Sequence, residues 1–131
     1  MRILALDYGR SRTGVAVSDP TGTLARPLCV VERATSEDGL ARIAQLVAEN
    51  DVTRVVVGMP LTLRGERGEQ AAETERFVEA LSARTEVPVV TFDERFTTDL
   101  AARSPSRSDE DARAAAHLLS SYLEWSSGAP A

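Results

Sequence analysis

The hydrophobic residues of this chain follow two different spacings, and together these predict an α/β fold. Short segments carry the continuous or alternating apolar pattern of β-strands, and they span residues 2–6, 13–19, 23–31, 53–60 and 87–94. The run at 2–6 is apolar almost throughout, which indicates a strand covered on both faces and therefore central in a sheet. Pro27 lies inside the third segment and favours an edge position or a bulge, because proline cannot donate a ladder hydrogen bond.

Three longer segments repeat apolar residues at the i, i+3, i+4, i+7 spacing of helices that bury one face. Ser36 is the expected N-cap of the first. The second covers residues 70–84 and the third runs from about residue 109 to 125, with a short extra helix expected from Thr97 or Thr98 to residue 102. The buried stripes would be Leu40, Ile43, Ala44 and Val47 in the first, Thr74, Phe77, Val78 and Leu81 in the second, and Ala115, Leu118, Leu119 and Tyr122 in the third.

The order of these elements is β-β-β-α-β-α-β-α-α, which predicts an antiparallel meander followed by two crossover strands. Right-handed crossovers would give a five-stranded mixed sheet of strand order 3-2-1-4-5 with helices on both faces. We expect one domain over residues 1–125. The Ser-, Gly- and Pro-containing segment 126–131 has the composition of a flexible C-terminal tail.

Composition excludes several classes of protein. No apolar run approaches the ~20 residues that cross a bilayer, so no membrane partner is expected. The N-terminal apolar run is too short for a signal peptide, which favours a cytoplasmic location. The single cysteine, Cys29, allows no disulfide framework and is expected to be a buried apolar residue. The net charge of −5 argues against a passive nucleic-acid-binding module. All 15 basic residues are arginines, however, and the guanidinium fork suits phosphate oxygens.

Acidic residues follow two of the expected strands at one edge of the sheet. Asp7 ends the first strand, and Asp93 and Glu94 end the fifth. The carboxyl ends of these parallel strands would meet, and such edges are where ligands bind in α/β sheets. Asp111 lies near the start of the last helix, on the same face as its apolar stripe. Carboxylates gathered in this way repel one another, and a divalent cation such as Mg²⁺ or Mn²⁺ relieves that repulsion.

Each carboxylate also has a structural explanation. Asp93 and Glu94 could be ordinary strand-end acids, and Asp111 could be the third position of a capping box that begins at Ser108. Asp109 and Glu110 compete with Asp111 for the role of third ligand, although they lie off the apolar stripe. The residues alone therefore leave the third ligand open.

Four segments of the chain resemble the YqgF family, also called RuvX, which is described as Holliday junction resolvases and as pre-16S rRNA nucleases. They are LALDYGRSRTGVAVSD, VVVGMPLTLRGERGEQA, FDERFTT and DARAAAHLLSSYLE, in that order, between about residues 2 and 125. The resemblance implies a ribonuclease-H-like fold and a nuclease site that holds two Mg²⁺ or Mn²⁺ ions. It assigns Asp7, Glu94 and Asp111 as catalytic metal ligands and favours Asp111 over Asp109.

The implied activity is metal-assisted hydrolysis of phosphodiester bonds in a nucleic acid, either precursor ribosomal RNA or branched DNA. Arginines near the acidic residues would contact backbone phosphates, and hydroxyls at a helix N-terminus would donate to another phosphate. The expected nucleic-acid-binding residues are Gly9, Arg10, Arg12, Arg64, Arg67, Arg95, Thr97 and Thr98.

One departure from the family pattern keeps a second interpretation open. The family commonly has a longer, basic loop between the last two ligands, whereas only sixteen residues separate Glu94 from Asp111 here. With the acidic net charge, this suggests as an alternative a nucleic-acid-binding ribosome-assembly factor with weak or vestigial catalysis.

A sugar-kinase or actin-like ATPase shares the Asp-x-Gly motif but needs a second lobe, which 131 residues do not supply. Endonuclease or exonuclease action, and a monomer or a homodimer, both stay open.

Overall fold

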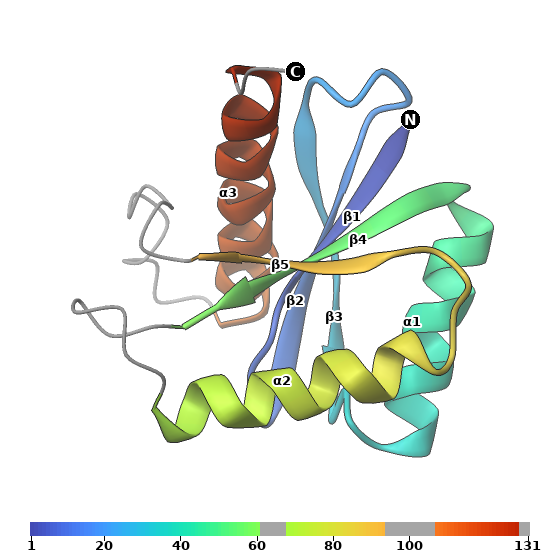
Figure 1. The fold of residues 1–131 in the computed structure, drawn as a ribbon, viewed down its shortest axis with the longest axis vertical. Coiled ribbons are helices and arrows are strands. Elements are labelled where there is room, and N and C mark those ends of the chain that lie inside the picture. The colour runs from blue at the N-terminus through green and yellow to red at the C-terminus, as the bar shows by residue number, and fades with distance from the viewer. Residues whose placement is uncertain (61–67, 94–106, 129–131) are drawn as a thin grey trace.

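Five strands and three helices form the fold in the computed structural model, which describes residues 1–60, 68–93 and 107–128 (Figure 1). The strands are β1 (Arg2–Asp7), β2 (Arg12–Ser18), β3 (Ala25–Glu32), β4 (Val52–Met59) and β5 (Val89–Asp93). The helices are α1 (Glu37–Glu49), α2 (Glu69–Ser82) and α3 (Arg107–Gly128). No helix among the described residues is long and apolar enough to cross a membrane.

The strands form one mixed sheet of order β3-β2-β1-β4-β5, which confirms the predicted order. β1 pairs antiparallel with β2 and parallel with β4, and β4 pairs parallel with β5. The edge position predicted from Pro27 is confirmed, because β3 is the edge strand beside β2. The predicted bulge is also present, since the β2–β3 register shifts between Val15 and Ala16, opposite Cys29 and Pro27.

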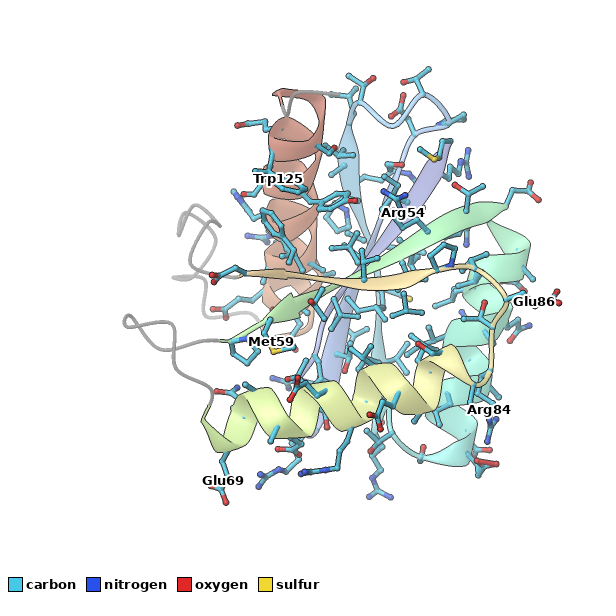
Figure 2. All side chains as sticks on the ribbon, in the orientation of Figure 1. Arg54, Met59, Glu69, Arg84, Glu86 and Trp125 are labelled. Atoms are coloured by element: carbon cyan, nitrogen blue, oxygen red, sulfur yellow. The ribbon has the colours of Figure 1, made fainter. Side chains whose placement is uncertain are left out.

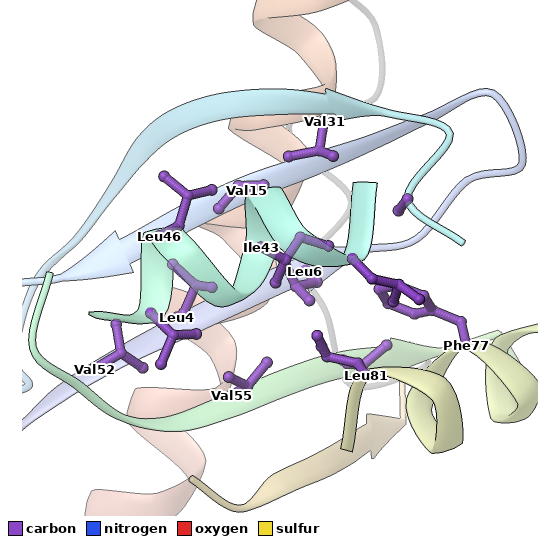
Figure 3. Close-up of a cluster of buried hydrophobic side chains, with 14 of the residues drawn as sticks. Leu4, Leu6, Val15, Val31, Ile43, Leu46, Val52, Val55, Phe77 and Leu81 are labelled. Carbon is purple, nitrogen blue, oxygen red and sulfur yellow. The ribbon is translucent and has the colours of Figure 1, made fainter. Parts of the chain in front are cut away.

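Helices cover both faces of the sheet, with α1 and α2 on one face and α3 on the other (Figure 1). Alternate residues of each strand point to opposite faces. In β1, Leu4 and Leu6 therefore pack with α1 and α2, whereas Ile3 and Ala5 pack under α3. Figure 3 shows the first of these cores, in which Phe77 of α2 lies near the strand side chains and is fully buried.

The helices begin and end close to their predicted bounds. Ser36 caps α1 as expected, because its hydroxyl accepts a hydrogen bond from the backbone N–H of Gly39 at 3.0 Å. α2 begins at Glu69 and ends at Ser82, against the predicted 70–84. α3 begins two residues before and ends three residues after its predicted range. All four residues of its predicted stripe are buried, and they are Ala115, Leu118, Leu119 and Tyr122. The short helix predicted at residues 97–102 lies outside the described residues.

Candidate active site

Asp7 ends the central strand of the sheet on the face that α3 covers. It is the last residue of β1, and the alternation of the strand places it on the side of Ile3 and Ala5. Its cross-strand partner in β2 is Gly14. Asp7 is half-buried and takes part in a polar interaction within the fold. The strand thus delivers a carboxylate to the boundary between a buried core and the solvent.

Asp111 is brought to the same place by the contact of α3 with β2. Gly14 lies on the α3 face of β2, and a Cβ built on it would come within 1.8 Å of the carbonyl oxygen of Asp111. The first turns of α3 therefore rest directly on the backbone of β2, next to Asp7. Two of the three predicted ligands, Asp7 and Asp111, are consequently both neighbours of Gly14.

The carboxylate of Asp111 faces an arginine and has an unused acceptor atom. Nε of Arg12 lies 2.8 Å from Oδ2 of Asp111, which makes an ion pair between β2 and α3. The N–H does not point at the oxygen, so the contact is not a hydrogen bond; Oδ2 is buried and accepts none from the described part of the chain. Arg12 compensates the charge of this carboxylate, and an oxygen that accepts no hydrogen bond is a natural ligand for a hard cation.

The structure also separates Asp93 from this pair. β5 alternates between the two faces, with Val90 and Phe92 packed on the α3 side. Asp93 is the next residue and therefore points to the side of α1 and α2. Asp93 ends β5, which lies two strands away from the β1 strand of Asp7, and it pairs with Met59 of β4. Figure 2 labels Met59 at the end of β4 and Glu69 at the start of α2. Because Asp93 points to the face opposite α3, it is not placed to act as a ligand beside Asp7 and Asp111.

The third predicted ligand, Glu94, lies outside the described residues. Within the described ranges, no group of three or more His, Cys, Asp or Glu side chains is arranged to hold a metal ion. Asp7 and Asp111 lie at neighbouring positions of the fold, and a buried oxygen of Asp111 accepts no hydrogen bond from the described residues. Carboxylate oxygens of this kind fit Mg²⁺ or Mn²⁺ in chemistry.

Arg10 lies on the opposite face of the sheet from Arg12. Its Nε and Nη2 atoms each donate a hydrogen bond of 3.0 Å to the carboxylate of Glu73 in α2. These hydrogen bonds lower the pKa of Glu73. Tyr8 stacks on Phe77 with ring centroids 4.7 Å apart, and burial together with the nearby Glu73 raises the pKa of its hydroxyl. The structure thus brings Arg12, but not Arg10, to Asp111.

Gly9 shapes the turn between β1 and β2 in the described fold. A Cβ on Gly9 would lie 2.4 Å from the carbonyl oxygen of Arg12, so only glycine allows this close approach. Its backbone N–H also donates to the hydroxyl of Thr13 at 3.4 Å. The remaining predicted nucleic-acid-binding residues lie outside the described ranges, and they are Arg64, Arg67, Arg95, Thr97 and Thr98.

The alternative role of Asp111 as a capping residue is not supported. α3 begins at Arg107, so Ser108 lies inside the helix and is not its N-cap. The Asp111 carboxylate contacts Arg12 of the sheet, across the interface between strand and helix.

Two residues that contact the predicted site residues were not identified from the sequence. Glu73 lies one position before the predicted stripe residue Thr74, and nothing in its spacing marks it as the partner of Arg10. Gly14 did carry a signal, because Gly14 and Ala16 are the small residues on one face of a strand whose other face holds Val15 and Val17. Small residues on one face of a strand indicate a close helix.

Comparison with known proteins identifies a family for this chain. A family model described as "RuvX: Holliday junction resolvase" matches residues 1–125. A protein of Chloroflexus aggregans described as "Putative pre-16S rRNA nuclease" is 46% identical over 131 residues, covering 93% of this chain and 92% of its own. A protein of Rubrobacter xylanophilus with the same description is 46% identical over 136 residues, covering 98% and 96%.

Solved structures share the fold at low sequence identity. The RuvC protein of T. thermophilus in complex with a Holliday junction substrate has a TM-score of 0.62 and 18% identity, covering 98% of this chain and 96% of its own. The fowlpox virus Holliday junction resolvase has a TM-score of 0.52 and 13% identity, covering 95% and 99%. These likenesses establish a ribonuclease-H-like fold. With that fold and a family match over nearly its full length, the chain belongs to the RuvX Holliday junction resolvase family.

Proposed function

We propose that this protein is a metal-dependent nuclease that hydrolyses phosphodiester bonds in precursor 16S ribosomal RNA. The observation that carries the proposal is that Asp7 and Asp111 both lie next to Gly14, Asp7 as its strand partner and Asp111 through its backbone. In addition, a buried oxygen of Asp111 accepts no hydrogen bond from the described residues. The relatives at 46% identity over most of their length bear the description of pre-16S rRNA nucleases, which favours RNA over branched DNA as the substrate. The cytoplasmic location expected from the sequence suits this substrate.

Asp7, Asp111 and Glu94 would hold two divalent cations, Glu94 being assigned from the family motif alone. When bound, such cations activate a water molecule and stabilise the oxygen that leaves the phosphate. Asp7 is fixed by β1, a strand paired on both sides, and Asp111 by a helix whose inner face is buried. Rigid supports of this kind hold ligands in place without rearrangement during the reaction.

Arg12 would bind a phosphate of the substrate beside the scissile bond. Its side chain is partly exposed, with a relative accessibility of 37%, while its Nε stays beside Asp111. The guanidinium fork matches phosphate oxygens, so the exposed part of this side chain is suited to a phosphate. Arg12 would thus position the backbone against the carboxylates.

The test is a cleavage assay with Mn²⁺ on a pre-16S rRNA fragment, with a four-way DNA junction as a parallel substrate. Asp7→Asn and Asp111→Asn should each lower the cleavage rate by about a thousandfold or more, because each removes a ligand of the reacting centre. Asp93→Asn is the matched control, since it removes a neighbouring carboxylate that faces away from α3, and it should keep the activity of the unmodified chain.

Three results would contradict the proposal in different ways. Cleavage retained in Asp7→Asn would show that the site is elsewhere. Cleavage of the junction but not of the RNA would replace the substrate. Binding of RNA without cleavage and without Mn²⁺ uptake would favour an assembly factor, which is consistent with the acidic net charge.

A further inference from the structure

We infer that Gly14 is a positioning residue of this site, because its missing side chain sets the separation between the carboxylates of Asp7 and Asp111. The inference rests on the proposed function and assigns a role to a residue that bears no functional group. Gly14 pairs with Asp7 across the β1–β2 ladder, and its free face meets the backbone of Asp111. It is therefore the physical link between the two ligands.

The contact leaves no room for any side chain. A Cβ on Gly14 would lie 1.8 Å from the carbonyl oxygen of Asp111, 2.4 Å from its carbonyl carbon and 3.1 Å from the nitrogen of Ala112. Real Cβ atoms essentially never approach another heavy atom closer than 3.0 Å. All three atoms belong to the helix backbone, so no change of side-chain rotamer relieves the overlap.

The backbone of Gly14 does not itself require glycine. Gly22 is the described glycine with a positive φ, and Gly14 lies within a regular strand pair. An alanine at position 14 is thus compatible with the strand and conflicts with the helix alone. The demand for glycine comes from the approach of α3.

The helix, and not the strand, would yield to a larger residue. β2 is held by hydrogen bonds to both β1 and β3, whereas Asp111 lies only a turn into α3. Further along, α3 is anchored by buried residues such as Leu118 and Leu119. An alanine at position 14 would push the first turns of α3 outward by roughly 1 Å or more to restore a normal contact distance. Asp111 would move with them while Asp7 stayed in place.

The experiment compares Gly14→Ala with Gly39→Ala in the full chain. Gly39 is a matched control, because its Cβ would lie 2.2 Å from the carbonyl oxygen of Arg33, a backbone clash of similar size on α1, across the sheet. Urea unfolding measures the stability of each variant, and calorimetric titration measures its affinity for Mn²⁺. We expect Gly14→Ala to weaken Mn²⁺ binding by about ten- to a hundredfold, as loss of a supporting residue does at metal sites, and Gly39→Ala to leave it unchanged.

A rescue variant separates positioning from general damage. Asp111→Glu extends the carboxylate by one methylene group, which is about the displacement that Gly14→Ala would impose. In the unmodified chain this change should weaken Mn²⁺ binding, and in the Gly14→Ala background it should restore part of the lost affinity. This non-additive pattern is the signature of two residues acting on one distance.

Several outcomes would overturn the inference. The first is an unchanged Mn²⁺ affinity in Gly14→Ala, or an equal loss of Mn²⁺ affinity in Gly39→Ala. The second is a Gly14→Ala/Asp111→Glu variant that binds Mn²⁺ no better than Gly14→Ala. The third is a Gly14→Ala chain that does not fold, which would give Gly14 a purely structural role. Failure of the unmodified chain to bind Mn²⁺ would instead refute the proposed function. In that case, crystal structures of the unmodified chain and of Gly14→Ala would decide the inference. If the first turns of α3 lie at the same position against β2 in both, the inference is disproved.

Discussion

Arg10 and Glu73 form a bidentate pair that fastens the β1–β2 turn to α2, with both hydrogen bonds at 3.0 Å. The pair lies on the face of the sheet opposite Asp111. Because both carboxylate oxygens of Glu73 are engaged by Arg10, the charge of this arginine is already compensated within the protein. Arg12, the first residue of β2, pairs instead with Asp111, so the two arginines are held by different carboxylates on opposite faces of the sheet.

Releasing Arg10 should increase the affinity for nucleic acid. Glu73→Gln removes the compensating charge, so the guanidinium of Arg10 becomes available to a phosphate. We expect the slope of log affinity against log salt concentration to steepen by about one unit, as for one added phosphate contact. Fluorescence anisotropy with a short RNA at several salt concentrations measures this slope. The double variant Arg10→Ala/Glu73→Gln should return to the original slope, and a steep slope in it would refute the explanation.

Removing Arg12 should have the opposite effect. Arg12→Ala takes away an arginine that we place against the substrate backbone, so the salt slope should become shallower by about one unit and KM should rise about tenfold. Arg10→Ala is the matched comparison, and it should change the slope little because Arg10 is paired with Glu73 on the face of the sheet away from the proposed metal ligands, whereas the partner of Arg12, Asp111, is itself one of those ligands. Equal effects of the two substitutions would show that the pairing seen in the fold does not persist in solution.

The strand order and the stripe residues could be predicted because they depend on patterns within single segments. The apolar run at 2–6 and Pro27 were enough to distinguish a central strand from an edge strand. The different partners of Arg10 and Arg12, Glu73 and Asp111, could not be predicted, since they depend on the path of the backbone between the two arginines. The small residues Gly14 and Ala16 indicate a close helix, but the contact of Gly14 with Asp111 joins segments far apart in the chain, so only the packed fold shows which helix residue it meets.

The β2–β3 turn should make stability depend on pH through Asp19. Its carboxylate accepts hydrogen bonds from the backbone N–H groups of Thr23 and Leu24, at 2.8 and 2.9 Å, and from the hydroxyl of Thr21. These bonds, that from the Thr21 hydroxyl foremost, hold the pKa of Asp19 well below its ordinary value. A lowered pKa in the folded state means that the ionised form stabilises the fold above the unfolded pKa and loses this effect as the pH falls through the folded pKa.

Asp19→Asn keeps the shape of this side chain and removes its charge. The variant should be less stable than the unmodified chain at pH 7, and the difference should shrink steadily as the pH is lowered below about 4, the unfolded pKa of aspartate. Urea unfolding at pH 7, 5 and 3 measures the difference. A constant difference across this range would mean that the charge of Asp19 contributes nothing to stability.

The docking of α3 should depend on its buried leucines. Leu119 is fully buried between the helix and the sheet, so Leu119→Ala should lower the free energy of unfolding by about 2–5 kcal/mol through lost apolar burial and the cavity left behind. Its neighbour Ser120 is exposed, and Ser120→Ala should change stability by no more than about 0.5 kcal/mol. Urea denaturation with an unchanged m-value checks both values. Similar stability of the two variants would contradict the packing of α3.

The positions of Asp7 and Asp111 along the chain determine when the site can form during synthesis. Asp7 belongs to β1 and Asp111 to α3, which follows all five strands in the chain, so Asp7 leaves the ribosome well before Asp111. The strands β1 and β2, on which α3 rests, emerge early, but the second carboxylate follows only after β5 has emerged. A nuclease built in this way would stay inactive until α3 has emerged and docked against the sheet.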